Sequence, residues 1–183
     1  MTMNDVSEAV GGFLFGDRGL GVFAILDGAS VPGLLEKLHV LKPEHECLYR
    51  GELTPDMAEV APYLVRLEDR SEMTSWILEQ GWGKHWGIFA LSQGDLRAMR
   101  QHFRKFLVVH DAEGKPMYFR FYDPRVLRTY LPTCNGEELA AIFGPVDSYL
   151  QEDEDAGVLL RFRQASGALA AKKEPLAPEK RRP

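Results

Sequence analysis

The sequence predicts an α/β or α+β fold, with a mixed sheet, flanking helices and a helix–hairpin–helix lobe in its C-terminal part. Continuous apolar runs at 21–27, 62–67 and 86–91 are typical of buried strands. Apolar residues at helical spacing, clearest at 96–106, predict helices between and after them. The chain has 183 residues, 45% of them hydrophobic, which is enough to form a core.

Residues 1–19 form an N-terminal arm that precedes the first buried strand. The arm is Gly-rich and weakly apolar, with Phe13 and Phe15 as its large side chains. We interpret it as a short helix or a docking arm. The main domain that we expect spans 20–163, in two lobes at 20–92 and 93–163.

The first lobe alternates strands with helices. After the strand at 21–27, Ser30 is placed to cap a helix with Pro32 in its first turn. A second helix begins after Ser71 and ends at Gly81, where glycine takes a left-handed conformation at low cost. In the rest of this lobe we predict strands at 46–49 and 62–67, with a loop between them at 51–61.

The second lobe begins with the helix that follows Ser92, whose hydroxyl we expect to cap it. A hairpin follows, and Gly114 supplies the positive φ that its turn needs. The returning strand alternates two sets of side chains, and Asp123 then caps a helix that starts at Pro124. The two faces of this strand consist of Met117, Phe119 and Phe121, and of Tyr118, Arg120 and Tyr122.

The C-terminal segment 164–183 differs in composition from the rest of the chain. It consists mostly of Ala, Lys, Glu, Pro and Arg, which favours disorder. We therefore predict a disordered basic tail.

Composition bounds the function classes. The net charge of −5 argues against nucleic-acid binding, which favours a basic domain. No apolar run approaches the roughly 18 residues of a membrane span, and the start lacks the basic residues of a signal peptide. Two isolated cysteines, Cys47 and Cys134, fit a reducing compartment. We expect a cytoplasmic protein without nucleic-acid or membrane partners.

Motifs for cofactors, metals and nucleophiles do not occur in the sequence. The five histidines lack metal-binding spacing, and no phosphate loop or nucleophile elbow is present. An alternative is a metal-dependent hydrolase or nuclease that uses Asp27, Asp123 and a histidine. For Asp123 a helix cap explains the residue better, because Asp-Pro is a common helix start.

A basic region lies between residues 97 and 128. It carries eight Arg and Lys against three Asp and Glu, a local balance of +5. Arg97, Arg100 and Arg104 form a stripe along the predicted helix. Arginines on such a face suit bidentate contact with a partner's carboxylates. The other interpretation is a solvated helix face with internal ion pairs, and the sequence leaves both open.

Four segments together resemble a known family. They read W-G-I-F-A-L-S at 86–92, L-R-A-M-R-Q-H-F-R-K-F-L at 96–107, F-R-F-Y-D-P-R-V-L at 119–127 and F-G-P-V at 143–146. Over about 20–163 the chain resembles a bacterial domain of formerly unknown function that was assigned to effector chaperones, or adaptors, of type VI secretion systems.

This resemblance implies a non-enzymatic cytoplasmic protein without a cofactor. Such proteins bind one cognate toxin effector and help to load it onto the VgrG spike protein. The family supplies no catalytic residues, and its motif positions have a mainly structural role; they are Phe119, Arg120, Phe121, Tyr122, Asp123, Pro124 and Arg125. Our candidates for a partner-binding surface are the arginine stripe and four aromatic residues of the arm and of a loop, namely Phe13, Phe15, Trp82 and Trp86.

Overall fold

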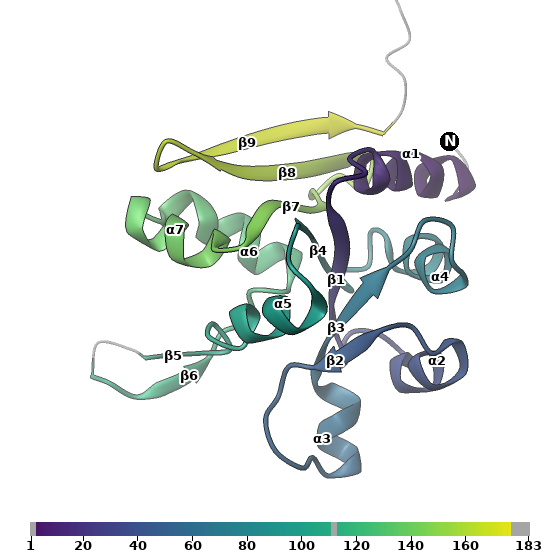
Figure 1. Cartoon of the computed structure of the whole chain (residues 1–183), viewed down its shortest axis with the longest axis horizontal. Helices are drawn as coiled ribbons and strands as arrows, with labels where there is room; N and C mark the ends of the chain where they lie inside the picture. Colours follow the sequence, from purple (N-terminus) through teal and green to yellow (C-terminus); the bar gives the residue numbers. More distant parts are fainter. Residues whose placement is uncertain (1–2, 111–112, 177–183) are drawn as a thin grey trace, which may run out of the picture.

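A seven-stranded sheet forms the centre of the computed structural model, which describes residues 3–110 and 113–176 (Figure 1). Its strand order is β2-β3-β1-β4-β7-β8-β9, and every ladder is antiparallel. The predicted combination of helices and a sheet is confirmed, but the sheet is antiparallel where we expected a mixed one. The strands are β1 (Gly21–Asp27), β2 (His45–Cys47), β3 (Pro62–Leu67), β4 (Gly87–Ser92), β7 (Val146–Glu152), β8 (Val158–Ala165) and β9 (Ala168–Pro175).

Helices cover both faces of the sheet, so that two hydrophobic cores form. Strand β1 shows this directly: Val22 and Ala24 belong to one core, whereas Phe23 and Ile25 belong to the other. On the first face lie α1 (Met3–Phe15), α2 (Leu34–Leu41) and α4 (Glu72–Gly81). On the second lie α5 (Leu96–Phe103), α6 (Pro124–Tyr130) and α7 (Gly136–Phe143). The prediction that residues 21–27 are buried on both faces is confirmed.

The central sheet runs through both predicted lobes, because β4 of the first pairs with β7 of the second. The helix–hairpin–helix arrangement of the second lobe is observed: β5 (Val108–His110) and β6 (Pro116–Tyr118) form a separate two-stranded sheet between α5 and α6. Gly114 has the predicted positive φ, at 81°. In the described ranges, no helix combines the length and apolar character that crossing a bilayer requires.

Several local predictions were wrong. Helix α2 begins only after Gly33, and Ser30 donates instead to the Asp27 carboxylate. Asp95, not Ser92, caps α5; the Ser92 hydroxyl donates to the Pro145 carbonyl. A short helix, α3 (Pro55–Val60), occupies the segment expected to be a loop.

Gly81 is also not the left-handed cap that we expected, since it lies within α4 and has no positive φ. Glycine is needed at this position because a side chain would not fit. A Cβ at this position would lie 2.4 Å from the Trp86 ring, so only glycine lets that ring pack against the helix.

The prediction of a disordered tail was wrong for the residues that the structure describes. Residues Ala168–Pro175 form strand β9, which pairs with β8 along its whole length. Leu176 then inserts into the first core, and Leu169 packs against the second. Pairing with a preceding strand stabilises a polar segment that composition alone classes as disordered. The rest of the predicted tail, 177–183, lies outside the described residues.

Candidate functional site

The motif segment 119–125 folds against the end of β1. Asp27, the last residue of that strand, is 1% exposed and forms an ion pair with the Arg120 guanidinium. Its carboxylate also accepts hydrogen bonds from the Ser30 hydroxyl, at 2.7 Å, and from the Ala29 amide, at 3.2 Å. Burial would lower the pKa of Arg120, but the bond to Asp27 raises it above its ordinary value. The ion pair joins β1 to the motif.

Two tyrosines lie beside this ion pair. The Tyr122 side chain is buried, and burial, together with the neighbouring Tyr49 and Asp27, raises the pKa of its hydroxyl.

The prediction that residues 117–122 alternate between the two faces of a strand was wrong. The strand ends at Tyr118 and the chain then turns, with the Asp123 amide bonded to the Arg120 carbonyl, so that Phe121 and Tyr122 are both buried.

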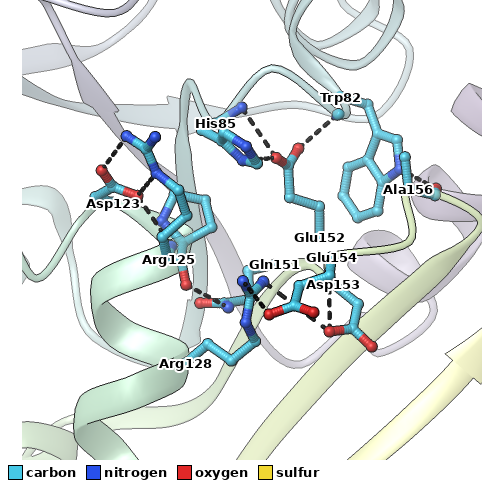
Figure 2. Close-up of polar contacts among 12 residues, drawn as sticks. Trp82, His85, Asp123, Arg125, Arg128, Gln151, Glu152, Asp153, Glu154 and Ala156 are labelled. Atoms are coloured by element: carbon cyan, nitrogen blue, oxygen red, sulfur yellow. Dashed lines mark hydrogen bonds and ion pairs between the residues drawn. The ribbon is translucent and has the colours of Figure 1, made fainter.

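Asp123 caps helix α6, as predicted. Its Oδ1 accepts from the Arg125 backbone amide at 2.9 Å and from Arg125 Nε at 3.0 Å, and its Oδ2 accepts from Arg125 Nη2 at 2.7 Å (Figure 2). Burial would raise the pKa of Asp123, but the bonds from Arg125 and the charge of Arg120 hold it below its ordinary value. The residue is thus a fixed anion bound to a cation.

A third buried carboxylate, Glu152 on β7, holds the aromatic loop between α4 and β4. It accepts hydrogen bonds from the backbone amides of Gly83 and His85, and the His85 ring contacts it (Figure 2). Trp82 donates its indole N–H to the Ala156 carbonyl at 2.7 Å. Trp86 is buried in the first core. Trp86 is thus part of the core, whereas Trp82 is only partly buried.

The charges of Asp27 and Asp123, the two carboxylates of the hydrolase alternative, both raise the pKa of Arg120. Each is bound to an arginine, however, and the nearby His85 contacts Glu152 instead. Within residues 3–110 and 113–176, no three His, Cys, Asp or Glu side chains are grouped to hold a metal ion. This arrangement is suited to cross-linking β1, α6 and the aromatic loop.

The arginine stripe divides into three different environments. Arg100 forms an ion pair with Glu46, at 2.6 Å. Arg104 donates to three consecutive backbone carbonyls at the end of β2 and just after it, those of Cys47, Leu48 and Tyr49, at 2.8–3.0 Å. Arg97 is exposed. Two of the three arginines thus hold α5 to the segment around β2, Arg100 through an ion pair and Arg104 through backbone carbonyls.

The N-terminal arm is helix α1, and its aromatic residues are half-buried. Phe13 packs against the first core, and the Arg161 guanidinium lies 5.9 Å from the centre of its ring. Phe15 lines a groove of about 650 Å³ between α1 and α4. The groove also contains Gly11, Gly12 and the start of α4, so the arm leaves part of its surface open.

Most of the chain matches the model of one protein family. The model of the family described as Domain of unknown function (DUF4123) matches residues 22–141, which is more than half of the sequence. The chain belongs to this family. Searches of curated proteins and of solved structures gave no match.

The DUF4123 region contains the whole Asp27–Arg120 contact and most of α7, but strands β7, β8 and β9 follow it. Glu152 therefore lies outside the matched range although it fixes a loop inside it. Sequence reasoning missed this residue, because it lies in an acidic segment, 147–155, that carries no recognisable motif. Buried and exposed residues do not alternate along β7, so a strand pattern would not have revealed Glu152.

Proposed function

We propose that this protein is a cytoplasmic chaperone, or adaptor, that binds a cognate type VI secretion toxin and helps to load it onto the VgrG spike. The observation that carries the proposal is membership of the DUF4123 family, together with the intact F-R-F-Y-D-P-R-V-L segment at 119–127. We also propose that the protein is not an enzyme and has neither nucleic acid nor membrane as a partner.

The hydrogen bonds and ion pairs of the buried carboxylates support this proposal. Asp27, Asp123 and Glu152 would be the first residues to consider for acid–base chemistry, because they are buried carboxylates near the motif. Each accepts hydrogen bonds from backbone amides, and Asp27 and Asp123 are also paired with arginines. Such a network stabilises a rigid framework, which a binding protein needs in order to present a preformed surface.

Co-expression with the toxin encoded by the adjacent gene tests the proposal. We expect the toxin to co-purify with the tagged chain, and the VgrG protein of the same cluster to join the complex when it is added. A toxin from a different secretion cluster serves as the control and is expected not to bind. If neither the adjacent toxin nor VgrG is retained, the proposed function is wrong.

A further inference from the structure

The β5–β6 hairpin exposes an unusual amount of apolar surface. Four of the seven exposed large hydrophobic residues in the described part of the chain lie on these two short strands. They are Val108 (43% exposed), Val109 (37%), Met117 (47%) and Tyr118 (74%). Clustered apolar exposure of this kind marks interaction sites, whereas single exposed apolar residues are ordinary.

The register places these residues on both faces of the hairpin. Val108 lies opposite Tyr118, and Val109 lies opposite Met117. Because neighbouring residues of a strand point to opposite faces, the two pairs face in opposite directions. The Tyr118 ring lies 6.1 Å from the Tyr49 ring, so the first pair faces the loop after β2. The second pair, Val109 and Met117, therefore faces away from Tyr49.

The root of the hairpin is fixed, although its strands project from the body (Figure 1). The Phe119 amide donates to the Leu107 carbonyl at 3.0 Å, directly below the two strands. Phe119 packs edge-on against Tyr130, and Leu107 and Phe121 are buried in the second core. An isolated two-stranded hairpin is marginally stable, so this anchor holds in place a sheet that still lacks a third strand or a covering layer.

Cations flank the hairpin. Arg50 follows Tyr49, Lys105 precedes Leu107, and both are exposed. Arg104 lies between them and bonds to neutral carbonyls, so those contacts leave its charge uncompensated. We call Arg50, Arg104 and Lys105 the basic flank. The charge of Arg50 acts on Arg104, since burial, Arg100 and Arg50 together lower the pKa of Arg104.

We propose that the Val108–Tyr118 face of the hairpin and the basic flank together form the docking surface for an acidic, apolar segment of the toxin. This inference rests on the proposed function and adds the site to it. Apolar side chains of the segment cover Val108 and Tyr118, while its carboxylates meet the exposed charges of Arg50 and Lys105. The free edges of β5 and β6 offer backbone groups to which an extended segment adds as a strand.

An anionic membrane is the other partner with matching chemistry, and the structure favours a protein. Unpaired strand edges are not tolerated in the hydrocarbon layer, but a polypeptide satisfies them. The whole chain also carries a net charge of −5, which opposes adsorption to an anionic surface.

Two matched double variants of the full-length chain test this site. The hairpin variant is Val108→Ser with Tyr118→Ser. The control variant is Val60→Ser with Met57→Ser on α3, two apolar residues that are also exposed, at 48% and 46%. All four positions are on the surface, so both variants are expected to melt within about 2 °C of the wild type. The Kd for the purified toxin from the adjacent gene is then measured for all three proteins.

The site predicts a Kd at least about tenfold weaker for the hairpin variant and unchanged for the α3 variant. If the wild type binds the toxin and the hairpin variant binds within about twofold of it, the docking site is wrong while the proposed function stands. If the wild type does not bind the toxin, both fail. Vesicles of phosphatidylserine and phosphatidylcholine form the last arm. If the wild type binds these vesicles and the hairpin variant does not, while both proteins bind the toxin, the hairpin is a membrane-binding site and the proposal is wrong.

Discussion

Individual side chains of the motif act through partners that lie at very different distances along the chain. Asp123 caps its own helix and binds Arg125, two residues away. Arg120 instead reaches Asp27, which lies 93 residues earlier. The first contact was predictable from the sequence, because a cap depends on local spacing. The second was not, because only the fold brings the end of β1 to the motif.

Asp123→Ala tests the cap. It removes bonds to the Arg125 amide and guanidinium, and we expect it to lower the free energy of unfolding by about 1–2 kcal/mol. Denaturation in urea measures the loss. Asp95→Ala is the matched control, because Asp95 caps α5 from an exposed position, and we expect a smaller effect of about 0.5–1 kcal/mol. Equal losses would show that the Arg125 contact adds nothing to the cap.

The same comparison has a defined pH dependence. The pKa of Asp123 is lowered in the folded protein from its ordinary value of 3.8. A carboxyl with a depressed folded pKa contributes its stability above the unfolded value and loses it as the pH falls through the folded one. The difference between wild type and Asp123→Ala should therefore be constant above about pH 5 and shrink below pH 3.8. A difference that grows on acidification would contradict the assignment.

At the scale of elements, α5 is both a core helix and a clamp on the loop after β2. Leu96, Met99 and Phe103 face the second core, as their spacing predicted. The opposite side uses Arg100 and Arg104 to bind a segment more than 50 residues away. Sequence spacing identified the stripe but could not show which arginines find internal partners. That outcome depends on where β2 lies.

Substitutions along the stripe should therefore have unequal effects. Arg104→Met leaves three carbonyl oxygens without their donor, and we expect a loss of about 1–3 kcal/mol in the free energy of unfolding. Arg97→Met changes an exposed side chain and should stay within about 0.5 kcal/mol of the wild type. Thermal and urea unfolding measure both. Similar values for the two variants would mean that Arg104 does not hold the loop.

Strand β9 offers a second test at this scale, in a segment whose composition favoured disorder. Leu176, just after the strand, is 5% exposed and lies in the first core. We expect Leu176→Ala to lower the free energy of unfolding by about 2–4 kcal/mol, the usual cost of truncating a buried leucine. Ala171→Ser on the exposed part of β9 is the control and should have little effect. If Leu176→Ala leaves the free energy of unfolding unchanged, the result would instead support the disordered tail that composition predicts.

For the molecule as a whole, the sequence predicted the types of element better than their arrangement. The strands at 21–27 and 62–67, the hairpin and the caps at Ser71 and Asp123 depend on local patterns, and all are observed. The pairing of β4 with β7 and of β8 with β9 depends on long-range contacts, which spacing does not encode. The family match covers 22–141, so the last three strands lie outside it.

Direct binding of the purified chain to the purified toxin from the adjacent gene tests the central claim most directly. Isothermal titration calorimetry should give a saturable isotherm, with a Kd in the micromolar range or below, as for a specific protein partner. A toxin from an unrelated secretion cluster should give no heat beyond dilution. The absence of binding to the adjacent toxin at concentrations of about 100 μM would contradict the chaperone function.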